Sequence, residues 1–177
     1  MKCLYYLTST LDSTRMISND LHQAGIDGWF IHVLSKDEAG LKKDKIHSSN
    51  YIEQLDILRY GIIFGAIGFS VGLIIASLAD LTEIIGSPMP RIIYYAIIGF
   101  STLFGAWEGG LTGIATENKK IAMFHDDLDS GSYLILIYAR KTLEAQVKKI
   151  MEARHPEAEL VAVDASFYNP LSGLKRI

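Results

Sequence analysis

The chain is poor in cysteine, proline and excess positive charge. Its 177 residues include one cysteine, Cys3, and four prolines. A single cysteine excludes an internal disulfide and any Cys-x-x-Cys metal or redox motif. The formal net charge of -3 gives no general attraction to phosphate backbones, and neither an RNP motif nor a zinc-finger or basic-helix pattern is present. We therefore expect no nucleic-acid partner.

Charge is also absent from two long stretches of the sequence. Residues 60–80 carry one acid, at the last position, and residues 92–115 carry one acid, Glu108. About 20 apolar residues suffice to cross a hydrocarbon core, so both stretches are candidate transmembrane helices. The intervening residues 81–91 contain Gly86, Pro88 and Pro90, which end one helix and favour a tight turn. The sequence predicts a two-helix transmembrane hairpin in a lipid bilayer.

Basic residues near the two spans predict the orientation of this hairpin. The connecting loop has one base, Arg91, whereas the outer ends of the spans are basic. The bases at these outer ends are Lys42, Lys43, Lys45, Arg59, Lys119 and Lys120. Lysine and arginine accumulate on the cytoplasmic side, so we expect a multi-pass membrane protein with both termini in the cytoplasm.

Small residues recur at helical spacing in both predicted spans, and they form one narrow face on each helix. Such faces let another helix approach closely. Two alternatives follow: packing between subunits of a homo-oligomer, which we favour, or packing only between the two helices of the hairpin. The face residues are Gly61, Gly65, Gly68 and Gly72 on the first span and Ser101, Gly105 and Gly109 on the second.

Glu108 is the one acid inside the second predicted span. An ionisable residue at membrane depth is a candidate for a gating or selectivity role in an ion or solute conduit. The simpler interpretation, which we favour, places Glu108 near the headgroups beside Trp107 or in an ion pair with Arg59.

The two flanks repeat one pattern of strand, helix and strand. Residues 2–7 and 29–34 enclose a helical pattern, and residues 133–139 and 160–163 enclose a second one over 142–154. Two such units predict a ferredoxin-like α+β domain in which four strands form one sheet and two helices cover one face. Neither flank buries a robust core alone, so we expect residues 1–50 and 131–165 to fold together, leaving one sheet face for lipid, solvent or a partner.

Shorter segments connect these parts. Residues 51–59 and 116–130 are expected to form juxtamembrane helices, the second with Ile121, Phe124 and Leu128 on one side. Residues 166–177 are expected to form an irregular tail that crosses to a neighbouring molecule.

Two stretches carry a family resemblance. The segments AGIDGWFIHVLS and FHDDLDSGSYLILIYA, on either side of a glycine-spaced hairpin, resemble small bacterial membrane proteins of unknown function related to the general-stress, heat-induced protein domain. The resemblance implies a bacterial inner-membrane location and an association with stress. It transfers no catalytic residues.

The densest group of potential metal ligands is His125, Asp126, Asp127 and Asp129. His125 and an acid four residues later could share a helix face and bind a cation, but the spacing matches no calcium loop. We favour a solvated helix end, where a cation or a basic neighbour would offset the unfavourable negative charge. His22, His32 and His47 are dispersed in the sequence and are interpreted as surface or core residues.

No cofactor is expected, and no nucleophile, base or metal set points to an enzyme. The favoured function is a homo-oligomeric membrane scaffold or sensor that binds its own copies and an unknown cytoplasmic protein. The alternative is a small ion or solute conduit in which Glu108 gates or selects.

Overall fold

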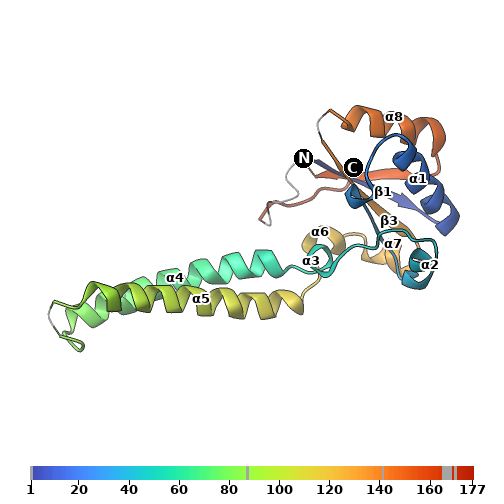
Figure 1. Ribbon diagram of the computed structural model, residues 1–177. Helices are drawn as coiled ribbons and strands as arrows, with labels where there is room; N and C mark the ends of the chain where they lie inside the picture. Colours follow the sequence, from blue (N-terminus) through green and yellow to red (C-terminus); the bar gives the residue numbers. More distant parts are fainter. Residues whose placement is uncertain (1, 87, 141, 165–168, 170) are drawn as a thin grey trace. The chain divides into compact units, whose positions relative to one another are not determined.

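The computed structural model describes residues 2–86, 88–140, 142–164, 169 and 171–177, and of residues 51 and 52 only the backbone. The chain divides into two compact units. The sheet unit comprises Met1–Tyr51 and Lys119–Ile177, and the helix unit comprises Ile52–Asn118 (Figure 1). The two flanks therefore fold as one unit, and the apolar stretches lie in the other.

The sheet unit is built on four strands, β1 (Lys2–Thr8), β2 (Ile31–Leu34), β3 (Tyr133–Ala139) and β4 (Glu159–Asp164). Their order is β2-β3-β1-β4, and every neighbouring pair is antiparallel. Because β1 and β2 both run against β3, they are parallel to each other but separated by it. The expected α+β class is confirmed, and its sheet is a four-stranded antiparallel one.

Two helices share a core with one face of this sheet. Helix α1 (Leu11–Gln23) begins at Thr10, whose side chain accepts a hydrogen bond from the backbone N–H of Ser13. Helix α8 (Glu144–Arg154) follows β3. The apolar residues at helical spacing face the sheet and belong to the first core cluster. They are Ile17 and Leu21 from α1 and Val147 and Met151 from α8.

Two elements near β2 were not expected from the sequence. A 3-10 turn, η1 (Gly28–Phe30), replaces the first residues of the predicted strand 29–34, and α2 (Glu38–Lys43) follows β2. The carboxylate of Asp37 caps α2 by accepting the backbone N–H of Gly40 at 2.9 Å. Leu41 is fully buried, so this short helix contributes to the first core.

The second face of the sheet is covered by the chain itself, which corrects the expectation of an open face. Residues 116–130 do not form one helix but two short ones, α6 (Lys119–Ala122) and α7 (His125–Asp129). Between them the buried Phe124 stacks on Tyr5 with ring centroids 6.0 Å apart. Ile121 and Leu128 join this second core cluster. The face needs such a cover because β3 (YLILIYA) is apolar on both sides of the sheet. With the cover in place, all seven of its residues are buried.

The described part of the C-terminal tail lies on the sheet unit rather than crossing to a neighbour. The backbone N–H of Ile177 donates to Val161 of β4 at 2.9 Å, and Arg176 forms an ion pair with Asp127 at 2.9 Å. Asp164, the last residue of β4, forms a buried ion pair with Lys120 of α6 at 2.7 Å. Residues 166–168 and 170 of the expected tail lie outside the described residues.

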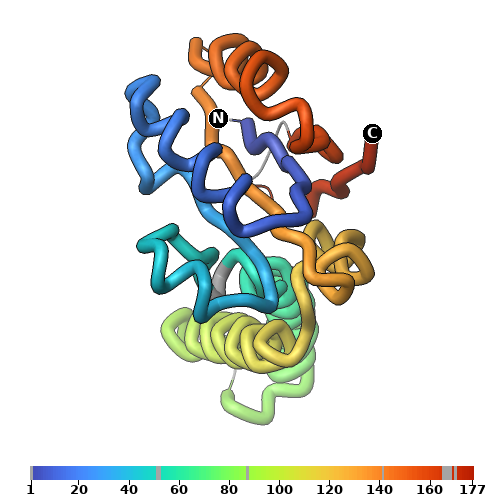
Figure 2. Tube along the Cα trace, turned by 90° about the vertical axis from the view of Figure 1, so that its right-hand side faces the viewer, coloured from blue at the N-terminus to red at the C-terminus, as the bar shows by residue number. Residues whose placement is uncertain are grey.

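The helix unit contains α4 (Ile57–Leu81) and α5 (Arg91–Ile114), which run side by side in Figures 1 and 2. The expected helix over 51–59 is only α3 (Tyr51–Gln54), and α4 begins within that range. Where α4 starts and α5 has ended, the two chain segments are paired: Asp56 N–H donates to Thr116 O at 3.0 Å and Asn118 N–H to Gln54 O at 2.7 Å. The chain thus enters and leaves the helix pair at the same end.

Of the helices described, α4 alone is both long and apolar enough to cross a membrane. Helix α5 is of similar length, but Glu108 and the tyrosines Tyr94 and Tyr95 lower its hydropathy.

Candidate helix-packing interface

The predicted glycine face of α4 lies against α5. A Cβ atom at Gly68 would collide with the carbonyl oxygen of Ser101, and one at Gly72 would lie 2.9 Å from the Cα of Ile98. At Gly65 it would meet the Cβ of Ala106 at 3.4 Å, and at Gly61 the carbonyl oxygen of Ala106 at 3.7 Å. The face is therefore tightest in its middle and looser toward the start of α4.

The small residues of α5 make the reciprocal contacts. Cβ atoms at Gly105 and Gly109 would collide with the carbonyl oxygens of Phe64 and Tyr60, respectively. The Ser101 side chain lies at Gly72. Backbone against backbone is the closest approach that two helices can make, and only glycine permits it here.

Gly113 belongs to the same interface, although the sequence analysis did not select it. A Cβ atom there would lie 2.5 Å from the Cα of Ile57. The signal was present, because positions 105, 109 and 113 repeat every four residues. The residue was missed because it lies near the end of the predicted span.

These contacts bear on the two alternatives for the glycine faces. The other helix of the same chain packs directly against Gly68, Gly72, Gly105 and Gly109. Packing within the chain therefore accounts for these glycines. A second copy of the chain could reach these faces only if α4 and α5 separated. Any contact between copies would instead use the outer surface of the pair.

The outer surface of the helix pair consists of large apolar side chains. Ile92 is 75% exposed, and Phe100 and Leu103 are each 72% exposed. Soluble monomers rarely expose contiguous apolar areas of this extent. The other exposed members include Ile62, Ile67, Phe69, Val71, Ile74 and Leu78 on α4 and Trp107, Leu111 and Ile114 on α5.

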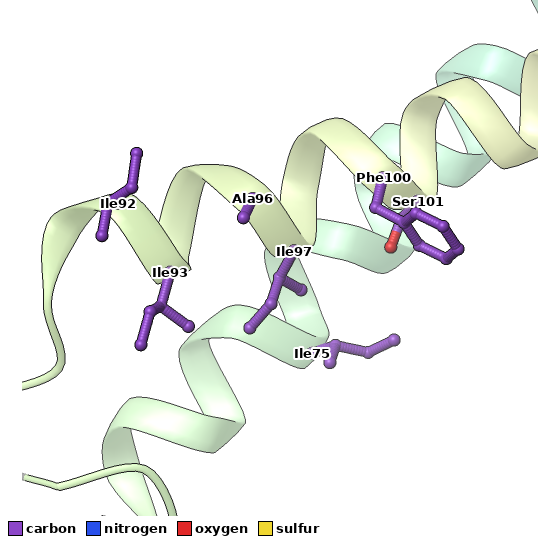
Figure 3. Close-up of a pocket in the computed structure, with 7 residues that line it drawn as sticks. All are labelled: Ile75, Ile92, Ile93, Ala96, Ile97, Phe100 and Ser101. Carbon is purple, nitrogen blue, oxygen red and sulfur yellow. The ribbon is translucent and has the colours of Figure 1, made fainter.

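A shallow apolar groove of about 560 Å³ lies where the two helices diverge, toward the connecting loop (Figure 3). In Figure 3 Ser101 is the one residue drawn with a side-chain oxygen. The groove therefore offers contact area but almost no polar recognition. It is lined by Ile75, Ile92, Ile93, Ala96, Ile97, Phe100 and Ser101.

Glu108 does not pair with Arg59 in this structure. Arg59 instead pairs with Asp56, one turn earlier on its own helix, at 3.2 Å. Glu108 is exposed on the side of α5, and among the described residues no base forms an ion pair with it. The other part of the simpler interpretation, a carboxylate near headgroups beside the exposed Trp107, stays a prediction.

Two of the three acids of α7 form ion pairs with basic side chains from distant parts of the sheet unit. Lys36 pairs with Asp129 at 2.8 Å, and Arg176 pairs with Asp127. The hydrogen bond from Lys36 and the nearby charge of His125 hold the pKa of Asp129 below its ordinary value. His125 itself lies 3.6 Å from Asp129, and Asp126 points to solvent.

No three metal-ligating side chains converge anywhere in the described part of the chain. The predicted cluster of His125, Asp126, Asp127 and Asp129 thus does not bring three ligands together. Basic neighbours offset part of its negative charge.

A polar network that the sequence analysis did not identify connects α1 to the segment after α8. The buried His155 lies 3.1 Å from Asp20 and 3.4 Å from Glu157, and Ser13 donates a hydrogen bond to Glu157 at 2.6 Å. That hydrogen bond is the main reason why the pKa of Glu157 is lowered. The Ser13 hydroxyl donates to a carboxylate and not to the imidazole, so these residues do not form the serine–histidine hydrogen bond of a catalytic triad.

The residues described in this section form a helix-packing surface and several structural ion pairs. Neither the models of known protein families nor the curated proteins match this chain.

Proposed function

We propose that the chain is a bacterial inner-membrane protein in which α4 and α5 form a transmembrane hairpin that carries a ferredoxin-like cytoplasmic unit. In this proposal it works as a homo-oligomeric scaffold or sensor and not as an enzyme. The observation that carries the proposal is the inverted surface of the helix unit, where glycine backbone is buried and large apolar side chains are exposed.

This inversion suits lipid as the surrounding medium. In water the bulky apolar residues of a helix pair would turn inward, because their burial supplies most of the stability. In lipid, association depends on close packing, so small residues occupy the contact and large ones face the acyl chains. The 25 residues of α4 extend about 37 Å at 1.5 Å per residue, enough for a core of about 30 Å.

The ferredoxin-like assignment is supported by the arrangement of the strands. Each flank supplies two strands that are parallel to each other and separated by one strand of the other flank. A helix on the same face connects the two strands in each case. The cytoplasmic location is supported by the exposed Lys42, Lys43 and Lys119, which flank the proposed spans in the sequence.

The conduit alternative has less support. The small-residue faces that could line a path are closed against each other, and Glu108 lies on the outer side of α5. A path past Glu108 would require several copies to surround it. The association with stress, like the unknown cytoplasmic partner, stays a prediction.

Membrane topology can be tested with the cysteine chemistry of the chain. Replacing the buried Cys3 by Ala removes the native thiol, and new thiols are then introduced singly as Glu83→Cys in the connecting loop or Ser9→Cys after β1. We expect a membrane-impermeant maleimide to label Glu83→Cys in intact spheroplasts and Ser9→Cys only after lysis. Equal labelling of both, or extraction of the protein without detergent, would refute the hairpin.

The oligomeric part of the proposal needs a separate measurement. Native mass determination in detergent should show more than one copy per particle. A single copy would remove the homo-oligomer and leave the membrane hairpin standing.

A further inference from the structure

Two histidines that are far apart in the sequence meet at Gly28 in the sheet unit. His22 lies in the last turn of α1, and His47 lies in the segment that pairs with β2, where Val33 N–H donates to His47 O at 2.9 Å. A Cβ atom at Gly28 would lie 2.5 Å from Nε2 of His22 and 3.4 Å from Cδ2 of His47. Both imidazoles therefore border the same point from separate segments.

The spacing of the two rings suits one shared ligand. Both distances are measured from one point, so His22 Nε2 and His47 Cδ2 are at most about 6 Å apart. Imidazole nitrogens bind zinc at about 2.0–2.1 Å, so the two rings would have to bring one nitrogen each to within about 4 Å of the other. Trp29 lies edge-on to His47 with ring centroids 6.4 Å apart, which limits the positions of that ring. Because Gly28 has no side chain, the His22 ring can lie against its backbone without a clash.

The hydrogen bond of His22 determines which nitrogen is available. Its Nδ1 lies 2.6 Å from the carbonyl oxygen of Ser18. A carbonyl can only accept, so Nδ1 carries the proton, and in the neutral ring Nε2 keeps its lone pair. Histidines that bind metals are typically oriented in this way, with the other ring nitrogen donating to a carbonyl.

We propose that His22 and His47 bind one divalent transition-metal ion, of the class that imidazole prefers, which includes Zn²⁺, Ni²⁺ and Cu²⁺. The protein supplies two ligands, and water completes the coordination. The carboxylate of Asp27, next to Gly28, adds negative charge nearby while its Oδ1 accepts the backbone N–H of Trp29 at 3.1 Å. The site is independent of the membrane proposal, because all of its residues belong to the sheet unit.

The test is a zinc titration of the untagged full-length protein in detergent, in competition with a chromophoric zinc indicator. We expect one Zn²⁺ per chain, with affinity reduced about tenfold or more in His22→Ala and in His47→Ala. Gly28→Ala should also weaken binding, since it displaces the His22 ring but removes no ligand. The matched control is His125→Gln, an exposed histidine that should leave the affinity unchanged.

Several results would overturn the site. They are the absence of zinc binding by the wild-type chain, unchanged affinity in either of the two alanine variants, and loss of binding in His125→Gln. Where a variant fails to fold, ring-proton NMR of the wild-type chain gives the answer. Zinc should shift the resonances of two of the five histidines, His22 and His47, and a shift of any other pair would contradict the proposal.

Discussion

The sheet unit and the helix unit of this chain bury opposite kinds of residue. In the sheet unit large apolar and aromatic side chains such as Tyr5 and Phe124 are fully buried, and the buried charges of Lys120 and Asp164 pair with each other. In the helix unit Gly72 and Gly109 are buried, and Phe100 and Leu103 are exposed. One unit of the chain thus buries large apolar side chains, and the other buries glycine.

The proposed membrane hairpin predicts this difference, because it gives each unit its own solvent. Apolar burial stabilises a unit that water surrounds, which is the proposed setting of the sheet unit. The helix unit gains little from hiding apolar side chains if lipid surrounds it, and close backbone contact must supply the stability. In the sheet unit the most destabilising substitutions should therefore be those that shorten a buried apolar side chain. In the helix unit they should be those that add a side chain to a buried glycine.

The largest effect is expected in the sheet unit from Phe124→Ala. The ring is fully buried and stacks on Tyr5, so its loss leaves a cavity in the second core. We expect a decrease of about 3–5 kcal/mol in the free energy of unfolding. Urea unfolding of the full chain at fixed detergent, followed by amide exchange of β3, measures it.

The matched control for this substitution is Asp126→Ala, two residues away and exposed. It should change the stability by less than about 0.5 kcal/mol. If Phe124→Ala were as mild as the control, the second sheet face would not be a core, and the expectation of an open face would return.

The next effect concerns the helix unit and depends on which glycine is changed. At Gly68 an added methyl collides with the Ser101 carbonyl, whereas at Gly99 it meets nothing within 4 Å. Gly68→Ala should therefore destabilise the helix pair by about 1–3 kcal/mol. Gly99→Ala should stabilise it by up to about 1 kcal/mol, because alanine is the better helix former.

This pair of variants is measured by the SDS concentration at which the helix pair unfolds, followed by circular dichroism. Opposite shifts of the midpoint would support the packed interface. Equal shifts for Gly68→Ala and Gly99→Ala would show that the glycine faces are not in contact, and the homo-oligomer alternative for these residues would regain its place.

The sequence predicted the elements whose patterns are long and regular. The strand over 133–139 has the predicted bounds, and the strand that starts at Lys2 differs by one residue. Helices α4 and α5 lie within a few residues of the two apolar stretches. Hydrophobic periodicity and the lack of charge are local signals, so one sequence contains them in full.

What could not be predicted depends on contacts between distant segments. The glycine spacing indicated a smooth helix face but not which helix occupies it. The meeting of His22 with His47 depends on how β2 pairs with residues 47–49. By contrast, the cover of the second sheet face had a visible signal: YLILIYA is apolar at every position, which is typical of a strand buried on both sides.

The smallest expected effect is a pH dependence of the stability of the sheet unit. The Ser13 hydrogen bond, helped by His155, holds the folded pKa of Glu157 below its ordinary value of 4.5. The folded chain therefore binds this proton more weakly than the unfolded chain does, so the stabilisation is complete above pH 4.5 and is lost as the pH falls through the folded pKa. The side chain is 44% exposed, which limits the contribution to about 0.5 kcal/mol.

Glu157→Gln should thus unfold more readily than the wild-type chain at about pH 7, and the gap should close toward about pH 3. The exposed Glu159→Gln serves as the control and should show no such convergence. The SDS midpoint of the helix pair should be the same in Glu157→Gln and the wild-type chain at both pH values, since Glu157 belongs to the other unit. A gap that persists at pH 3 would mean that Glu157 stabilises the fold through packing rather than through its charge.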